Sequence, residues 1–518
     1  MLLLVLSFFA TALNCRRRNS DVVTVALSEK FTTFDTLTTT ASDAAAERVK
    51  NLLFNSLVKK DENFDFVGEM AKDIKTSDDG KTITFILRDG IKFHNGKEMT
   101  SVDVKYTLDE LFKSNGYKAG SFFDTVADES KKDATKRIPH ITSIEAPDAK
   151  TIVIMLDRPI LRHQLLSNLV AIPIIPEGTS GQQKDAPVGS GPFKFVSFDA
   201  SQNIVEFAAN TDYWDGAPKI PKLRVKTVTD ANSLQAELQS GGVDLAPQPS
   251  NLLPDTLRAM NSIANLKVEQ FDGSNIQYLV FNTQSPPLNN AKIRQAIGYA
   301  IDRQKIISEL LFDQAKIASS ILPPQSWAYS AGKQYTYDLA RVTQLLQEAG
   351  YKNEEIVFKY GSGSAAVNNY SQAIQNSLKV AGLNVRIETL EINTIRTQLA
   401  QGQYQMFTGI WVGGNQDPIF LRDLFSSTKI PGGSVSCCNR SRYVNTEVDK
   451  TVEEALRNET DREKAKALYA KTWELVSEDV PLFPLWYPAN IVVSNKCIGN
   501  INISPSGDWT FLKNITVQ

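Results

Sequence analysis

The chain has 518 residues, of which 42% are hydrophobic and 22% are charged. A chain of this length and composition can bury a large core and is expected to divide into two or three domains. The formal net charge is -2 and no long block of one sign occurs apart from Arg16-Arg17-Arg18. A nucleic-acid partner is not predicted, because the basic surface that such a partner requires is missing.

Cysteine and histidine residues are few and scattered. The chain contains Cys15, Cys437, Cys438 and Cys497, and its histidines are His94, His140 and His163. No histidine lies beside a cysteine or in HExxH spacing, so neither a metal site nor a cofactor is predicted. In an oxidising compartment Cys437 or Cys438 could pair with Cys497, and buried free thiols are the alternative.

The chain begins with an apolar segment, MLLLVLSFFATALN. It is shorter than the about 20 residues that a membrane-spanning helix needs, and it is typical of the apolar part of a signal peptide. No basic residue precedes it and three arginines follow it, which departs from the usual charge order. We therefore expect residues 1–19 to be a signal or lipoprotein-anchor segment, with the mature protein in a periplasmic or other extracytoplasmic location. Cys15 resembles the acylated cysteine of a bacterial lipoprotein, and cleavage elsewhere or an uncleaved anchor are the alternatives.

Residues 82–93, TITFILRDGIKF, alternate apolar and polar side chains. Ile83, Phe85 and Leu87 fall on one face of a strand, and Asp89-Gly90 predicts the turn of a hairpin. Asn95-Gly96 predicts a second turn.

A helix is predicted to follow from Thr100. Thr100 and Asp103 have the spacing of a capping box, and one helical face carries Val104, Leu108, Leu111 and Phe112. The chain then continues as short strands until several prolines indicate a domain boundary near residue 186.

Residues 271–486 alternate between strand and helix patterns, which indicates an α/β domain. A strand is predicted at 271–283 and one long helix at 286–312. A compact helix is predicted from an N-cap at Asp338 to Gly350, and residues 371–391 repeat the order helix, glycine, strand.

The segment QMFTGIWVGGNQDP, residues 405–418, reads as a strand at 406–412 that ends in glycines. Glycine lets a ligand approach the backbone and bind its N–H and C=O groups. The alternative is an ordinary loop without a ligand.

A resemblance to a known family rests on several stretches in order. DDGKTITFILRDGIKFHNGKEMTSVDVKYTL at 78–108 resembles the signature of the family 5 extracellular solute-binding proteins, the peptide and nickel type that serves ABC importers. The further similar stretches are VGSGPFKF at 188–195, TDYWDGAP at 211–218, LQSGGVDL at 238–245, YLVFNTQSPPL at 278–288 and IRQAIGYAIDR at 293–303.

The resemblance implies an α/β fold of two lobes that close on a ligand, with an extra domain inserted in the first lobe. The first lobe domain would comprise residues 20–56, 186–270 and 487–518. The inserted domain would be 57–185, and the distal lobe 271–486.

The resemblance also implies a ligand site beside the strand that ends at Trp411. In the dipeptide-binding members, the loop after this Trp carries an aspartate that pairs with the peptide's α-ammonium. Gly414 stands at the position of that acid, and Asp417 is expected to cap the following helix. The ligand-binding residues are expected to be Trp411, Gly413, Gly414, Asn415, Phe34, Ser274, Asn275 and Tyr278.

The function implied is the substrate-binding component of an ABC importer, which captures a peptide or peptide-sized solute as a monomer and delivers it to a permease in the cytoplasmic membrane. Nickel is less well supported as cargo, because the distal lobe contains no histidine. A binding scaffold reused as a surface adhesin or assembly factor is an alternative. A hydrolase fits less well and no enzyme is predicted, because GxSxG is absent and the histidines are isolated.

Overall fold

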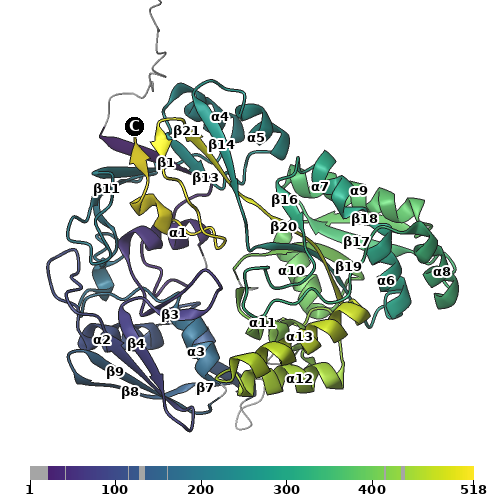
Figure 1. Cartoon of the computed structure of the whole chain (residues 1–518), viewed down its shortest axis with the longest axis horizontal. Coiled ribbons are helices and arrows are strands. Elements are labelled where there is room, and N and C mark those ends of the chain that lie inside the picture. Colours follow the sequence, from purple (N-terminus) through teal and green to yellow (C-terminus); the bar gives the residue numbers. More distant parts are fainter. Residues whose placement is uncertain are drawn as a thin grey trace, which may run out of the picture.

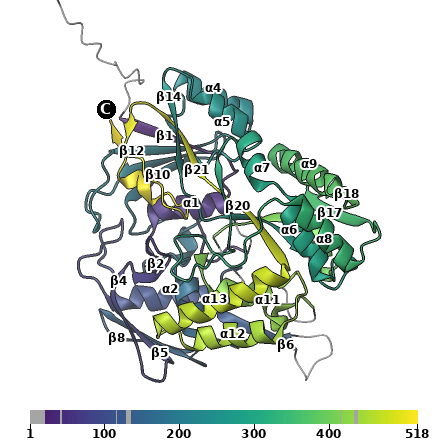
Figure 2. The same cartoon turned by 45° about the vertical axis from the view of Figure 1, so that its right-hand side comes forward.

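The computed structural model describes residues 21–40, 43–114, 116–127, 135–159, 161–413, 416–432 and 438–518. Two lobes lie side by side (Figure 1), and the chain passes between them near one end of the molecule. One crossing leads from β14 (Leu266–Phe271) to β15 (Ile276–Phe281), and the other leads from β20 (Leu482–Pro488) to β21 (Asn490–Asn495). Figure 2 shows the second crossing as the yellow ribbon between the lobes.

The first lobe is built on a sheet whose described strands have the order β10-β11-β12-β1-β13-β21-β14. Its central strand β1 is parallel to both β12 and β13, and all but one of its residues are buried. The elements not yet bounded are β1 (Val22–Leu27), β10 (Phe193–Asp199), β11 (Ile204–Ala209), β12 (Lys222–Thr227), β13 (Leu245–Pro247), α1 (Ala44–Leu53), α4 (Ala231–Ser240) and α5 (Pro254–Met260). The short strands β22 (Ile498–Gly499) and β23 (Thr516–Val517) pair with each other.

A second, antiparallel sheet has the order β4-β5-β9-β8 and lies below the first in Figure 1. Its strands are β4 (Ala71–Thr76), β5 (Thr82–Leu87), β8 (Ile141–Asp148) and β9 (Thr151–Leu156), and its helices are α2 (Ser101–Lys113) and α3 (Leu161–Leu169). Two small hairpins accompany it, formed by β2 (Val58–Lys60) with β3 (Phe66–Gly68) and by β6 (Phe123–Ala127) with β7 (Thr135–Pro139).

The predicted strand at residue 82 is confirmed, but the predicted hairpin is wrong. Ile83, Phe85 and Leu87 are completely buried on one face of β5. The partners of β5 are β4 and β9, so the segment after Asp89-Gly90 does not pair back onto it. The reason is the next turn, in which Phe93 N–H donates to Lys97 O at 2.9 Å and directs the chain toward α2.

The predicted start of α2 is confirmed. Thr100 is the N-cap of a capping box, and the backbone N–H of Thr100 donates to the Asp103 carboxylate at 2.9 Å. Asp103 is buried and also accepts from Lys97 Nζ at 2.6 Å. Of the apolar face that the sequence predicted, Val104, Leu108 and Leu111 are buried and Phe112 is partly buried.

The distal lobe has a mixed sheet with the described order β16-β20-β15-β19-β17-β18. Alternation along β15 builds two cores, because Ile276, Tyr278 and Val280 face the core beneath α10 to α13, while Leu279 and Phe281 face the core beneath α6 to α9. The strands not yet bounded are β16 (Ala315–Ile317), β17 (Ile356–Gly361), β18 (Val385–Leu390) and β19 (Met406–Trp411). The helices are α6 (Ala291–Ala300), α7 (Arg303–Glu309), α8 (Leu339–Ala349), α9 (Ala365–Val380), α10 (Ile392–Gln401), α11 (Ile419–Phe425), α12 (Thr446–Arg457) and α13 (Arg462–Asp479).

The single helix predicted at 286–312 is wrong, because α6 and α7 are separate helices. The chain is extended at Ile301, and the Asp302 carboxylate accepts the Lys305 N–H at 3.0 Å, which caps a new helix. The helix predicted from Asp338 to Gly350 is confirmed as α8. Asp338 accepts the Arg341 N–H at 2.9 Å, and Gly350 follows the helix with a φ of 66°.

Candidate functional site

Trp411 lies at the end of β19, opposite Ile276 of β15. The Trp411 ring stacks on Tyr278 at 6.0 Å between centroids, and the Arg440 guanidinium lies 5.6 Å from its centroid. The edge of Phe420 in α11 packs against it at 4.9 Å. The indole Nε1 is buried and has no hydrogen-bond partner among the described residues.

The loop after Trp411 is held by residues of the connection between β14 and β15. Gly413 has a φ of 75°, and its N–H donates to Asn275 Oδ1 at 3.3 Å. Gln416 Nε2 donates to Ser274 Oγ at 2.8 Å, and Ser274 is fully buried. Gly414 and Asn415 lie outside the described residues. Ser274 and Asn275 therefore hold this loop in place through their side-chain hydrogen bonds.

Tyr278 and Phe34 differ in their places. Tyr278 is buried beneath Trp411, and burial raises the pKa of its hydroxyl to about 12. Phe34 lies in the first-lobe core, where its ring packs against Phe31 at 4.7 Å and Phe195 at 5.0 Å. The structure thus brings Trp411, Gly413, Ser274, Asn275 and Tyr278 into one neighbourhood and assigns Phe34 to a separate aromatic cluster. The ligand-binding role of all these residues stays a prediction.

Asp417 has a second partner that the sequence did not indicate. Its Oδ1 accepts the Ile419 N–H at 3.1 Å, but the N-cap of α11 is Pro418, so Asp417 contacts the first helical residue without being the predicted cap. The same oxygen also accepts from Nε2 of His163 in α3, which belongs to the other lobe. His163 is only 3% exposed and therefore lies buried where the two lobes meet.

The second ring nitrogen of His163 also faces a carboxylate. His163 Nδ1 lies 2.5 Å from Glu459 Oε2, and Glu459 accepts from the Tyr469 hydroxyl at 3.0 Å. Carboxylate oxygens only accept hydrogen bonds when ionised, so both imidazole nitrogens carry hydrogen and the ring is positively charged. Burial alone would lower the pKa of His163, but the negative charges of Asp417 and Glu459 outweigh it and raise the pKa to about 10.

The pKa of Asp417 shifts in the opposite direction to that of His163. Burial alone would raise the pKa of its carboxyl, but the His163 charge outweighs this effect and holds the pKa well below its usual range. Asp417 and Glu459 contact opposite nitrogens of one ring and so do not converge on one point as metal ligands would. Within the described ranges no group of three or more His, Cys, Asp or Glu residues has a metal-binding arrangement.

Other contacts join the lobes near this cluster (Figure 1, α3 beside α12 and α13). The backbone N–H of Trp327 donates to the backbone carbonyl of Asn63 at 3.2 Å. Arg462 pairs with Asp65 and lies 3.5 Å from the Trp327 ring centroid. A pocket of about 520 Å³ opens beside the cluster between the lobes, and it is lined by Thr76, Ser77, Asp78, Asp79, Gly80, Pro159, Arg162, His163, Leu456, Arg457, Glu459 and Thr460.

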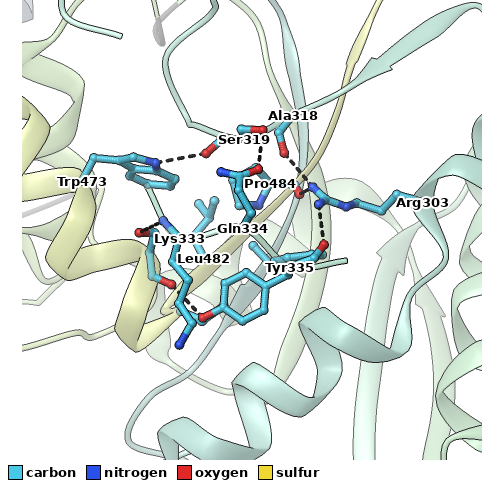
Figure 3. Close-up of a pocket in the computed structure, with 12 residues that line it drawn as sticks. Arg303, Ala318, Ser319, Lys333, Gln334, Tyr335, Trp473, Leu482 and Pro484 are labelled. Atoms are coloured by element: carbon cyan, nitrogen blue, oxygen red, sulfur yellow. Dashed lines mark hydrogen bonds between the residues drawn. The ribbon is translucent and has the colours of Figure 1, made fainter. Parts of the chain in front are cut away.

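Two smaller pockets have room for about one water molecule each. One lies beside Trp411 and Arg440. The other lies inside the distal lobe, where Arg303 Nη1 donates to Ala318 O and Pro484 O at 2.6 and 2.9 Å, and Nη2 donates to Tyr335 O at 2.9 Å (Figure 3). Because these guanidinium donors bind backbone carbonyls, Arg303 has a structural role at this pocket and connects separate segments of the lobe.

Cys438 and Cys497 each belong to a disulfide bond, and the pairing of Cys437 or Cys438 with Cys497 stays a prediction. Cys15 and Cys437 lie outside the described residues. None of the helices that the structure describes has the length and hydrophobicity of a membrane span.

Sequence comparisons connect this architecture with known proteins. The family profile described as bacterial extracellular solute-binding proteins, family 5 Middle, matches residues 65–432. The chain is 26% identical over 511 residues to the oligopeptide-binding protein AppA of Bacillus subtilis, which covers 95% of this chain and 90% of that protein. It is 29% identical over 494 residues to heme-binding protein A of Haemophilus influenzae, which covers 90% of this chain and 87% of that protein.

Solved structures show the same fold. HbpA2 from Haemophilus parasuis superimposes with a TM-score of 0.79 at 23% identity, over 96% of this chain and 100% of that chain. NikZ from Campylobacter jejuni, in complex with Ni(L-His), superimposes with a TM-score of 0.74 at 23% identity, over 96% and 99% of the two chains. The α/β fold of two lobes that the sequence predicted is confirmed, and the exact domain limits stay a prediction. With the family profile matching most of its length, the chain belongs to the bacterial extracellular solute-binding proteins of family 5.

Proposed function

We propose that this protein captures a peptide or peptide-sized solute between its lobes and delivers it, as a monomer, to an ABC permease in the cytoplasmic membrane. The observation that carries the proposal is the asymmetry of the lobe contacts. The chain crosses between the lobes at one end, from β14 to β15 and from β20 to β21. At the other end the described residues of the two lobes meet through non-covalent contacts such as that of His163 with Asp417. Such an arrangement lets lobes open about a hinge and close on a ligand.

The chemistry of the site suits a cargo with peptide-like groups. The buried Trp411 Nε1–H lacks a partner among the described residues, and a carbonyl oxygen of the cargo would accept it. The pocket of about 520 Å³ beside His163 also lies between the lobes and has the size of a small-molecule site. Relatives whose names specify oligopeptides or di- and tripeptides support this cargo class.

The cargo is proposed to bind without an ammonium anchor at Asp417, because that carboxylate already holds the His163 cation. We expect short peptides with a free amino terminus and their N-acetylated counterparts to bind with similar affinity. Calorimetry on matched pairs measures this. A free-amine preference of about tenfold or more, abolished in Asp417→Asn, would show that the cargo amine competes for this carboxylate.

Native mass spectrometry of the full protein, purified without unfolding, tests the function itself. We expect a bound solute that is released unchanged on denaturation. Trp411→Ala should lose this solute, whereas Ile410→Ala should keep it, because Ile410 is the neighbour on β19 and is 48% exposed. A solute retained equally by both variants would remove Trp411 from the site, and chemical turnover of the bound solute would overturn the binding role.

We place the protein outside the cytoplasmic membrane, tethered through Cys15 or free. The apolar segment at 1–14 and the extracellular character of the family support this location. Incorporation of labelled palmitate that disappears in Cys15→Ala would establish the tether. Full-length protein recovered only from the cytoplasm would contradict export.

A further inference from the structure

At the buried contact between the lobes, the positive charges belong to the first lobe and the negative charges to the distal lobe. The cations on the first-lobe side are His163 and Arg162 of α3 and Lys60 of β2. The acids on the distal side are Asp417, before α11, and Glu459, between α12 and α13. No other described charge contacts the His163 ring, whose remaining neighbours include Phe66 at 5.0 Å.

We propose that closure of the lobes takes up a proton at His163, so that a proton is a second ligand of the closed form. The inference deepens the proposed function and rests on it, because it requires lobes that open and close. It goes further by coupling cargo capture to the acidity of the surrounding compartment.

The closed form requires the proton for a geometric reason. His163 Nε2 meets Asp417 and Nδ1 meets Glu459, and a neutral ring would direct a lone pair at one of these carboxylates. Both acids are almost completely buried, at 3% and 9% exposure, so water cannot relieve that repulsion.

Opening the lobes removes both acids together, since both belong to the distal lobe. His163 would then keep the Phe66 ring, with Lys60 Nζ 5.7 Å from the centroid of that ring and Arg162 lining the same pocket as His163. Positive charges on the same side disfavour a further one. Ser167, one turn further along α3, adds no charge. The open form is therefore expected to carry a neutral imidazole above the ordinary histidine pKa of 6.5.

The sign of the pH effect follows from linkage. The pKa of His163 is raised on closure, so its contribution to closure is fully present below pH 6.5 and is lost as the pH rises toward about 10. Within this window the ratio of closed to open molecules should fall by about tenfold for each pH unit. Ordinary carboxylates and guanidinium groups titrate outside this window and do not produce the same profile.

Small-angle X-ray scattering of the full, cargo-free chain from about pH 5.5 to about pH 9 tests the inference. Wild type should expand as the pH rises, and His163→Gln should be expanded throughout and insensitive to pH. His140→Gln is the matched control, because His140 is equally buried but pairs with Asp124 within the first lobe, at 3.1 Å. This control should keep the wild-type profile.

Nitrogen-15 NMR of the imidazoles in wild type gives a reading that does not depend on a variant folding. With three histidines in the chain, His163 is expected as the ring still doubly protonated at about pH 8 in the compact form. A wild-type radius that does not change with pH, a neutral His163 ring in the compact form, or an unchanged pH profile in His163→Gln would each overturn the inference. Bound solute detected by native mass spectrometry alongside such a result would leave the proposed function standing.

Discussion

At the scale of single residues, the histidines of this chain show how partners decide protonation. His94 Nε2 lies 3.0 Å from Gly191 O, and its Nδ1 accepts the Gly189 N–H at 3.4 Å. One nitrogen therefore donates and the other accepts, which is the pattern of a neutral ring. Burial lowers the pKa of His94 to about 4, whereas at His163 two carboxylates outweigh the same effect of burial and raise the pKa.

We expect His94 to destabilise the fold in acid. Its folded-state pKa lies below the ordinary 6.5, so the unfolded chain binds the proton more readily. Neutral His94 contributes about 3 kcal/mol to the free energy of unfolding above pH 6.5, and this contribution is lost as the pH falls toward 4. Denaturant unfolding of His94→Gln should show a smaller decrease in stability than wild type over this range. An identical decrease in both proteins would exclude His94 as the titrating group.

At the scale of elements, the glycines of VGSGPFKF have a packing role. Gly191 N–H donates to Leu53 O at 2.8 Å, at the point where α1 ends. A Cβ on Gly191 would lie 2.5 Å from the Leu53 carbonyl carbon and 2.6 Å from Leu52 O. This motif therefore marks a close approach of the 188–192 turn to a helix end.

We expect Gly191→Ala to lower the free energy of unfolding by about 2 kcal/mol or more, because the atoms in the way are backbone atoms that cannot rotate aside. Gly181→Ala is the matched control, since no atom lies within 4 Å of its added Cβ. Chemical denaturation of both variants measures the difference. Equal stability of the two variants would show that α1 moves aside without cost.

At the scale of the whole molecule, buried and exposed ion pairs between the lobes should contribute different amounts to stability. Glu459 is 9% exposed and holds a buried cation, whereas the Asp65 and Arg462 side chains are each 36% exposed. Glu459→Gln should cost about 3 kcal/mol by leaving His163 under-compensated, and Asp65→Asn less than about 1 kcal/mol. Thermal melting of the full chain near neutral pH compares them. A larger loss of thermal stability in Asp65→Asn than in Glu459→Gln would show that the exposed pair contributes more to the lobe contact than the buried one.

Much of the architecture was accessible from the sequence because local rules set it. Apolar alternation predicted the buried face of β5, and the caps at Thr100 and Asp338 predicted where α2 and α8 begin. The order of the family-like stretches predicted the two-lobed α/β fold. Local rules were insufficient where a cap lies inside a continuous helical pattern, as at Asp302 between α6 and α7.

The sequence by itself determined that the strand from Met406 to Trp411 ends in a glycine loop, because periodicity and turn chemistry are properties of neighbouring residues. Only the tertiary structure decided what that loop meets. His163 and Asp417 are 254 positions apart, and Glu459 is contributed by a third segment. No spacing rule joins such residues, because their contact arises where one lobe packs against the other, and it is this contact that fixes the charge of His163.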